Sequence, residues 1–424
     1  MRVEQLRSAM VAGLLAGGRI VSAPVEQAFR AVPRHLFLPE LPPDQAYRDE
    51  AVATKWADGV AISSASQPSM MAIMLEQLDL RPGHRVLEVG AGTGYNAALM
   101  ARLVGPTGRV VAVDIDADLV SGAARNLAAA GFDEVAVATR DGALGYPEFA
   151  PYDRIVLTVG SWDIQPAWWR QLAPGGRLLL PLSVRGSQLA VALDADPGPP
   201  PGLRSTSVRG CAFVRLRGRG AGPDNGGALT SADADVGLDG VSVQHADDPP
   251  ADTTALRTLL GQPGHVLASP VRLAPVDLWD GLGLWLAVRE PGACRLLVTA
   301  SAAARVPSLL PAGMDGGTMA LLDAGGLAVL APTGPVGAEL ERPFPVAVRA
   351  FGPGGTRVAD RLARLLAEWH AAGRPAATEL SVRAHPVDTD PPLPGPGTVI
   401  RKRHSALVLD WPGNPVVDAP ILER

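Results

Sequence analysis

The chain has 424 residues, and at roughly 150 residues per domain this length predicts two or three domains. Hydrophobic residues make up 47% of the chain and charged residues 19%, which allows a sizeable core and excludes global disorder. The net charge of −5 offers no basic surplus for phosphate backbones, so nucleic acid is a poor candidate partner.

Neither a metal site, a disulfide framework nor a membrane segment is expected. Cys211 and Cys294 are too few and too far apart for a disulfide framework or a paired-cysteine zinc site, and the histidines form no HExxH pattern. No uncharged apolar run reaches the roughly 18 residues of a membrane span, and the N-terminus is not a clean signal peptide. We therefore expect a cytoplasmic protein.

The first 66 residues predict a helical lead-in followed by an irregular segment at 41–66. Val25, Ala28 and Phe29 follow helical spacing, and Pro33 ends that helix. From Gln67 onward, strand and helix patterns alternate, which is typical of βαβ units and a parallel sheet. The expected strands are 85–90, 109–115, 135–139, 154–159, 177–181 and 188–193, and the expected helices are 68–78, 95–103, 118–130 and 168–172.

Two stretches with few apolar residues mark candidate boundaries. Residues 195–207 contain the run PGPPPG, residues 218–254 are poor in apolar anchors, and residues 209–216 between them could add an edge strand. Beyond residue 255 a second apolar-rich region predicts a small α+β domain. The expected division is a catalytic domain at 1–217, a linker at 218–254 and an accessory domain at 255–424 for substrate recognition.

A glycine-rich turn follows the first core strand. It reads Glu88-Val-Gly-Ala-Gly-Thr-Gly94 and leads into a helix, so a ligand can approach the backbone and the helix N-terminus closely. A dinucleotide fingerprint requires glycine at the sixth position, where Tyr95 stands, and no Gly-Lys-Ser/Thr triplet of a phosphate loop follows. The acid-x-Gly-x-Gly-x-Gly pattern instead suits S-adenosylmethionine, a cofactor without a pyrophosphate.

Two further acids follow the next strands. Asp114 ends the second strand and can accept hydrogen bonds from ribose hydroxyls, and Asp141-Gly142 follows the third strand, placed to reach the adenine. The alternative interpretation is a set of turn glycines with unrelated surface acids. The ordered pattern favours a cofactor site, whose expected residues are Glu88, Gly90, Ala91, Gly92, Thr93, Gly94, Asn96, Asp114, Ile115, Asp141 and Gly142.

These features resemble the protein-L-isoaspartate (D-aspartate) O-methyltransferase family over residues 1–217. The most specific matches are Ala31-Val-Pro-Arg-His-Leu-Phe-Leu-Pro39, Ser66-Gln-Pro68 and Val86-Leu-Glu-Val-Gly-Ala-Gly-Thr-Gly-Tyr-Asn96. The resemblance implies a Rossmann-like α/β sheet with helices on both faces, S-adenosylmethionine as cofactor, and methylation of a carboxyl group of abnormal aspartyl residues in peptides. It also implies that Ser66 belongs to the substrate loop and that Glu88, Asp114 and Asp141 hold the adenosyl group.

The chain departs from the repair enzymes in two places. The loop at 54–68 is longer, and the C-terminal half is additional. Both features look like the branch that modifies ribosomal peptide natural products, the graspetide and lanthipeptide methyltransferases. That branch esterifies an aspartate of a macrocyclic peptide, and the ester collapses to an aspartimide (succinimide). Ordinary isoaspartyl repair and a non-catalytic peptide-binding scaffold are the alternatives, and the oligomeric state is left open.

The chemistry of the acceptor narrows the candidate catalytic residues. A carboxylate with a pKa near 3.9 is ionised at pH 7 and attacks a sulfonium methyl without a general base. Ser63, Ser64 and Ser66 offer hydroxyl donors beside a helix N-terminus, which favours an anion, although Ser66 could be a plain helix N-cap. Several further residues could contact or attract a peptide substrate, and the alternative for each is an exposed or packing role. They are Lys55, Trp56, Trp162, Trp168, Trp169 and Arg401-Lys-Arg403.

Overall fold

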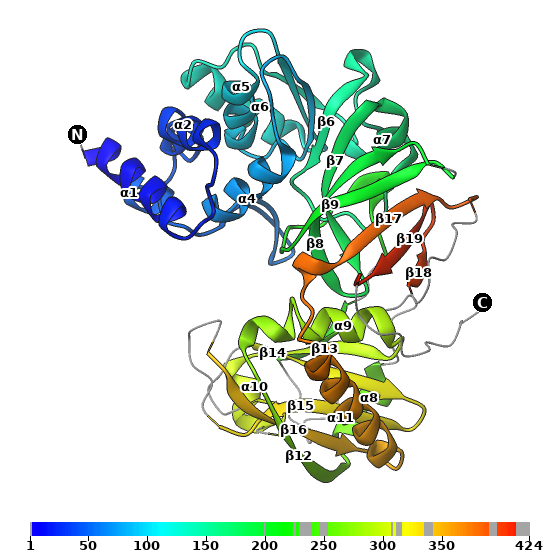
Figure 1. Ribbon diagram of the computed structural model, residues 1–424. Helices are drawn as coiled ribbons and strands as arrows, with labels where there is room; N and C mark the ends of the chain where they lie inside the picture. The colour runs from blue at the N-terminus through cyan, green and yellow to red at the C-terminus, as the bar shows by residue number, and fades with distance from the viewer. Residues whose placement is uncertain are drawn as a thin grey trace.

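The computed structural model places most of the chain in two β-sheet units (Figure 1). A ten-stranded sheet has the order β18-β19-β17-β9-β8-β7-β6-β3-β4-β5, a seven-stranded sheet has the order β10-β11-β13-β14-β15-β16-β12, and β1 and β2 form a separate hairpin. The structure describes residues 2–198, 200–223, 226–228, 240–245, 253–306, 308–310, 316–334, 342–389 and 397–412.

The elements have the following bounds. The α-helices are α1 (Arg2–Ala16), α2 (Ala23–Ala31), α3 (Pro43–Ala46), α4 (Pro68–Leu78), α5 (Tyr95–Val104), α6 (Ala117–Ala129), α7 (Pro166–Gln171), α8 (Thr253–Leu260), α9 (Leu282–Arg289), α10 (Ala300–Arg305) and α11 (Gly355–Ala371). The strands of the hairpin and of the ten-stranded sheet are β1 (Val52–Ala57), β2 (Val60–Ala65), β3 (Arg85–Val89), β4 (Arg109–Asp114), β5 (Ala136–Thr139), β6 (Tyr152–Leu157), β7 (Leu172–Val184), β8 (Ser187–Asp196), β9 (Gly202–Gly210), β17 (Ser381–Pro386), β18 (Thr398–Arg401) and β19 (Ser405–Asp410). The strands of the seven-stranded sheet are β10 (Gly226–Ala228), β11 (Val241–His245), β12 (Pro263–Leu273), β13 (Ala293–Val298), β14 (Gly316–Asp323), β15 (Gly326–Pro332) and β16 (Phe344–Phe351).

The predicted parallel α/β sheet is confirmed. Strands β5, β4, β3, β6 and β7 pair in parallel, and β7, β8 and β9 continue the sheet as an antiparallel meander. Residues 86–89 of β3 are all buried, as expected for a central parallel strand, and Glu88 is the one acid among them. Helices α4 and α5 pack on one face with α1 and α2 outside them, and α7 packs on the other face. Parallel strands therefore end together at one edge.

The segment expected to be irregular contains a β-hairpin. Strands β1 and β2 pair antiparallel around Asp58 and Gly59, which have φ angles of 50° and 76°. Two consecutive residues with positive φ are the geometry of a tight hairpin turn, and Asp-Gly is a preferred sequence for it. The expectation for residues 41–66 was therefore wrong at this hairpin, because the small polar residues of the strands obscured an Asp-Gly turn signal.

The stretch at 195–207 is not a boundary between units. Asp196 pairs with Gly202, so the proline-rich run forms the connection between β8 and β9. Strand β9 covers residues that were assigned to the boundary, whereas most of the proposed edge strand at 209–216 is irregular. Strand β9 also lies inside the sheet, between β8 and β17. The proline-rich run therefore marks a connection within the sheet and not the end of the first unit.

The strands of the two sheets do not follow the expected division at residues 217 and 255. Strands β17, β18 and β19 belong to the ten-stranded sheet, and in Figure 1 they lie beside β9 although they are near the C-terminus. Strand β11 lies within the expected linker and pairs with β13 of the second sheet. Within that linker, residues 224–225, 229–239 and 246–252 lie outside the described residues. Sequence patterning predicted neither these four strands nor their partners.

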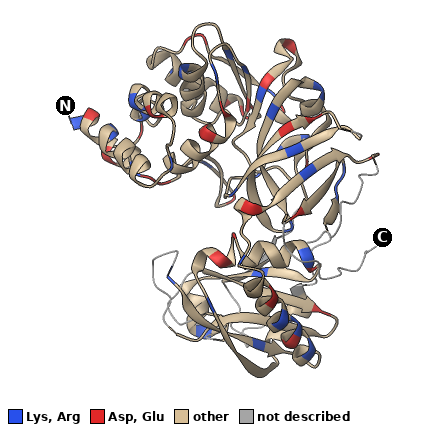
Figure 2. Cartoon of the chain, in the orientation of Figure 1, with Lys and Arg blue, Asp and Glu red and all other residues tan. Residues whose placement is uncertain are grey.

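The units share one hydrophobic core and several polar contacts. Leu182 of β7, Leu330 of β15 and Leu409 of β19 are buried in the same cluster. Arg295 is buried in the second sheet and donates to the Ser187 hydroxyl over 2.7 Å, so it fastens the β7–β8 turn. Basic and acidic residues are interspersed over both units (Figure 2). The chain therefore behaves structurally as one packed body.

Candidate active site

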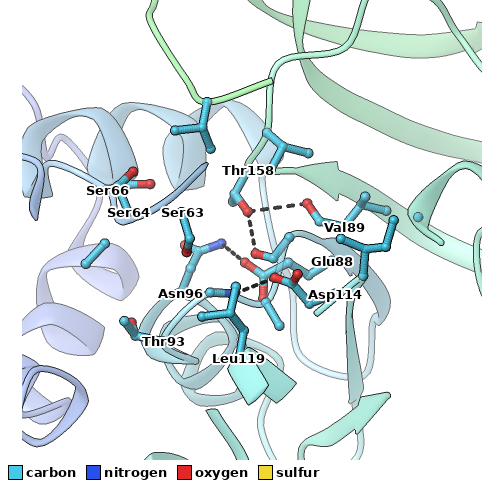
Figure 3. Close-up of a pocket in the computed structure, with 18 of the residues that line it drawn as sticks. Ser63, Ser64, Ser66, Glu88, Val89, Thr93, Asn96, Asp114, Leu119 and Thr158 are labelled. Atoms are coloured by element: carbon cyan, nitrogen blue, oxygen red, sulfur yellow. Dashed lines mark hydrogen bonds between the residues drawn. The ribbon is translucent and has the colours of Figure 1, made fainter. Parts of the chain in front are cut away.

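A cavity lies at the carboxyl ends of the parallel strands (Figure 3). Open α/β sheets bind their ligands at this edge. The end of hairpin strand β2 forms one wall, the loop after β3 forms another, and residues 214–217 complete the enclosure. The expected site residues that line it are Ser63, Ser64, Ser66, Glu88, Gly90, Ala91, Gly92, Thr93, Asn96, Asp114, Ile115 and Gly142. Two expected residues, Gly94 and Asp141, do not line it.

The glycine turn presents its backbone to the cavity. Gly90 has a φ of 103°, and a Cβ atom there would lie 2.8 Å from the Thr158 hydroxyl, so glycine is required both for conformation and for space. The Thr158 hydroxyl donates to the Gly90 carbonyl over 2.7 Å. The Gly92 N–H donates to Asp114 over 3.0 Å, which joins the turn to the end of β4. The turn is therefore fixed from two sides before a ligand binds.

Glu88 is a buried acid at the floor of the cavity. Only 1% of the residue is exposed, and burial raises the pKa of its carboxyl to about 8. Asn96 donates to one carboxyl oxygen over 2.8 Å, while the other oxygen, Oε2, has no partner. A buried and unsatisfied carboxyl oxygen costs free energy unless a donor or cation reaches it. The site therefore fits a ligand that carries a positively charged group.

Asp114 and Asp141 occupy different environments. Asp114 lines the cavity at the end of β4, close to the glycine turn. Both carboxyl oxygens of Asp141 accept backbone N–H groups, from Ala143 over 3.0 Å and from Arg219 over 2.8 Å. These bonds hold the turn so that Gly142, and not Asp141, faces the cavity. The direct contact of Asp141 with adenine stays a prediction.

The three serines come from the hairpin and the segment after it. Figure 3 shows them across the cavity from Glu88 and Asp114. Ser63 is 5% exposed and its hydroxyl accepts from Thr54 over 2.9 Å. The N-cap of α4 is Gln67 without a side-chain bond, so the N-cap alternative for Ser66 is not what the structure shows.

Sequence reasoning missed several residues of the cavity. Arg34 lies in the Pro-Arg-His-Leu-Phe motif, was not proposed for the site, and lines the cavity beside Ser66. Thr158 and residues 214–217 reach it from the end of β6 and from the segment after β9. The motif match at Arg34 was an available signal. The later segment carried none, because its place depends on the long-range pairing of Gly160 with Arg215.

The remaining candidates lie outside the cavity. Lys55 forms ion pairs with Asp116 over 3.0 Å and with Asp118 over 2.8 Å, so it fastens the hairpin to the loop after β4. Trp56 is 62% exposed, whereas Trp168 is buried and donates to the Gly142 carbonyl over 2.9 Å. Lys402, expected on a solvated basic patch, is buried and donates to the Trp162 carbonyl in the loop after β6. That expectation was wrong because the turn after β18 inserts into the sheet unit.

Within the described ranges, no group of three or more histidine, cysteine, aspartate or glutamate side chains is placed to hold a metal ion. In that same part of the chain, no helix is both long and apolar enough to span a membrane.

Comparison with known proteins agrees with this geometry. The family model for protein-L-isoaspartate(D-aspartate) O-methyltransferase (PCMT) matches residues 4–220. A protein-L-isoaspartate O-methyltransferase of Methanopyrus kandleri is 44% identical over 217 residues, which cover 51% of this chain and 92% of that protein. The one from Thermotoga maritima is 40% identical over 168 residues, which cover 40% of this chain and 53% of that protein.

Comparison with solved structures found two whose descriptions name a protein-L-isoaspartate O-methyltransferase. One protein-L-isoaspartate O-methyltransferase has a TM-score of 0.48 at 24% identity, with 89% of this chain and 96% of that chain covered. A Plasmodium falciparum protein described as a putative PCMT, in complex with S-adenosyl-L-homocysteine, has a TM-score of 0.43 at 21% identity. The match covers 49% of this chain and 97% of that chain.

The parallel sheet with its glycine turn and the acid at the end of β4 define an S-adenosylmethionine-dependent methyltransferase. Within that class, the chain belongs to the protein-L-isoaspartate(D-aspartate) O-methyltransferase family.

Proposed function

We propose that the chain transfers a methyl group from S-adenosylmethionine to a carboxylate of an aspartyl or isoaspartyl residue in a peptide. One observation carries the proposal: a single cavity joins the glycine turn and Asp114 to the serines at 63, 64 and 66. The first group of residues suits an adenosyl cofactor and the second suits an anionic acceptor. Family membership supports the same reaction.

Several residues would hold the cofactor. Asp114 would accept hydrogen bonds from the ribose, and the backbone at Gly90 to Gly92 would lie against the cofactor. Glu88, with its unpartnered oxygen, would face a cationic group of the cofactor. When bound, the cofactor supplies a methyl group activated by a sulfonium. Gly142 and Ile115 line the cavity and would pack near the adenine.

The protein's own contribution is to align the acceptor and exclude water. A carboxylate is ionised at neutral pH, so no residue has to remove a proton from it. Ser63, Ser64 and Ser66 can donate hydrogen bonds that fix its orientation. Such alignment can be worth up to about 7–11 kcal/mol of the barrier. In this account the serines orient the acceptor and do not act as nucleophiles.

We further propose a macrocyclic ribosomal peptide as the substrate, with the accessory region at 255–424 taking part in its recognition. The β1–β2 hairpin supports this, because it extends from the cavity to an exposed apolar tip at Trp56 and Val60. An unmatched region is not particular to this chain, since the Thermotoga protein is also matched over only 53% of its length. In the proposed product the neighbouring backbone nitrogen attacks the ester carbonyl, methanol leaves, and an aspartimide forms.

Labelled methyl transfer tests the proposal. We expect label on a peptide carboxyl, and its loss as methanol in mild base. A macrocyclic peptide with an internal aspartate is compared with a linear isoaspartyl peptide. Faster transfer to the macrocycle supports the ribosomal-peptide substrate, and efficient turnover of only the linear peptide supports repair. Label on nitrogen contradicts both, and failure to bind S-adenosylmethionine in equilibrium dialysis supports the non-catalytic scaffold.

A further inference from the structure

Arg34 is a fully buried cation in the wall of the cavity. The residue is 0% exposed, and its guanidinium donates to the carbonyl oxygens of Ala46 over 2.9 Å and Ser66 over 3.0 Å. A third, weaker contact of 3.7 Å reaches the Met71 sulfur, and the guanidinium lies 5.1 Å from the centre of the Tyr95 ring. Every one of these partners is electrically neutral. Its contacts therefore satisfy the N–H groups but not the charge.

No carboxylate compensates that charge directly. In the part of the chain that the structure describes, no acid lies within ion-pair distance of Arg34, and the acid that acts on it from further away is Asp49. Asp49 already accepts the backbone N–H of Ser69 over 2.8 Å. Burial without a counter-ion lowers the pKa of Arg34 from its usual value. A buried cation without a partner is costly, so this position favours an anion in the cavity.

The other charged residues of the cavity have contacts of their own. Arg217 forms an ion pair with Asp116 over 2.7 Å, and Asp114 accepts the Gly92 N–H on the cofactor side. Glu88 has a pKa of about 8, so its carboxyl is mostly neutral at pH 7. Arg215 donates to the carbonyl oxygens of Gly222 and Pro223. The charge of Arg34 therefore makes the electrostatic potential beside Ser66 positive, which favours the binding of an anion there.

We propose that Arg34 is a specificity-determining residue, whose positive charge selects an ionised carboxylate over a neutral group at the acceptor position beside Ser66. The inference rests on the proposed function and deepens it. The acceptor carboxylate enters with one negative charge, whereas the methyl ester that forms carries none. The same field therefore favours the substrate over the product, which helps the ester to leave. Arg34 acts through its field and through the placement of Ser66, not by bonding to the methyl group.

The test compares two ligands that differ only in charge. One is a linear isoaspartyl peptide, and the other is the same peptide with that carboxyl group replaced by a carboxamide. Dissociation constants are measured by calorimetry with S-adenosylhomocysteine bound, so that no transfer occurs and no sulfonium charge contributes. We expect the wild type to prefer the carboxylate about tenfold or more, and Arg34→Met to lose most of that preference. An unchanged preference in Arg34→Met overturns the inference.

Two variants separate charge from structure. Arg154 is also buried and also donates to backbone carbonyls, of Leu78 over 2.7 Å and Asp79 over 3.1 Å, but it lies at the start of β6, away from the cavity. Arg154→Met is therefore expected to lower stability and to keep the preference. Arg34→Lys keeps the charge and loses the guanidinium geometry, so it is expected to keep part of the preference. Should Arg34→Met fail to fold, loss of the whole preference in a folded Arg34→Lys overturns the inference.

The result also separates this inference from the proposed function. Wild-type protein that does not methylate the isoaspartyl peptide or any macrocyclic aspartyl peptide contradicts the function itself. Wild-type protein that methylates one of them, together with an Arg34→Met variant that still prefers the carboxylate, contradicts only the role of Arg34.

Discussion

Asn96 donates a hydrogen bond of 2.8 Å to one carboxyl oxygen of Glu88 and leaves the other oxygen without a partner. The pair thus joins the first turn of α5 to the last residues of β3. It also makes the cofactor site sensitive to pH, because burial raises the pKa of Glu88 to about 8.

The first prediction concerns stability against pH in the cofactor-free protein. The folded protein holds the Glu88 proton more tightly than the unfolded chain does. The contribution of Glu88 to the free energy of unfolding is therefore complete below a pH of about 4.5 and is lost as the pH rises through about 8. The loss is of the order of 3–5 kcal/mol. In Glu88→Gln this decline is expected to disappear. Denaturant unfolding at several pH values measures it, and parallel curves for the two proteins would contradict the assignment.

The second prediction concerns Asp114. Its carboxylate accepts the Gly92 N–H over 3.0 Å and is expected to hold the cofactor's ribose. Asp114→Asn is expected to weaken binding of S-adenosylhomocysteine by about 10- to 100-fold, because two charge-assisted hydrogen bonds are lost. Isothermal calorimetry measures the change. The control is Asp118→Asn, since Asp118 pairs with Lys55 at 2.8 Å and does not line the cavity. Equal effects in both variants would contradict the role of Asp114.

The third prediction concerns the fastening of the β18–β19 turn. Asp163 is 1% exposed and accepts the His404 N–H over 2.7 Å and the Ser405 hydroxyl over 2.5 Å. Asp163→Ala is expected to lower the free energy of unfolding by about 2–4 kcal/mol, because three donors, the Ile164 N–H among them, lose their acceptor. Ser405→Ala removes only one of these bonds and is expected to cost about 1 kcal/mol. Urea unfolding measures both losses. A larger loss in Ser405→Ala than in Asp163→Ala would contradict the fastening role.

The fourth prediction concerns the tip of the hairpin. Trp56 is 62% exposed, so Trp56→Ala is expected to change stability by less than about 0.5 kcal/mol. If the tip contacts the peptide, the variant raises KM for the peptide several-fold and leaves cofactor binding unchanged. Val21→Ala, at a residue 77% exposed on a different part of the chain, serves as the matched control. An unchanged KM in Trp56→Ala would remove the hairpin tip from the substrate site.

The sequence was informative where structure is local. The glycine turn, the strand before it and Asp114 belong to one continuous βαβ pattern, and they lie where that pattern places them. Asp141 shows the limit of the same reasoning. Its position after β5 was expected correctly, but whether its carboxylate faces a ligand depends on two backbone N–H groups, one of them at Arg219. Spacing along the chain does not report such a distant donor.

Features that depend on distant pairing could not be predicted. Strand β17 joins the first sheet through the pairing of Arg383 with Arg204, residues separated by the whole second unit. The burial of Lys402 follows from that return of the chain. A basic triplet read along the sequence indicates a solvated surface, and only the fold shows that its middle residue is enclosed. Arg34 differs from these features: its motif was an available signal, and only its contacts with Ala46 and Ser66 required the fold.

The structure of a complex with S-adenosylhomocysteine and an isoaspartyl peptide tests the central claim most directly. We predict that the ribose lies at Asp114, that the sulfur faces the wall formed by the serines, and that the peptide carboxylate lies beside Ser66. A cofactor bound elsewhere, or a carboxylate placed away from the Ser63–Ser66 segment, would contradict the account.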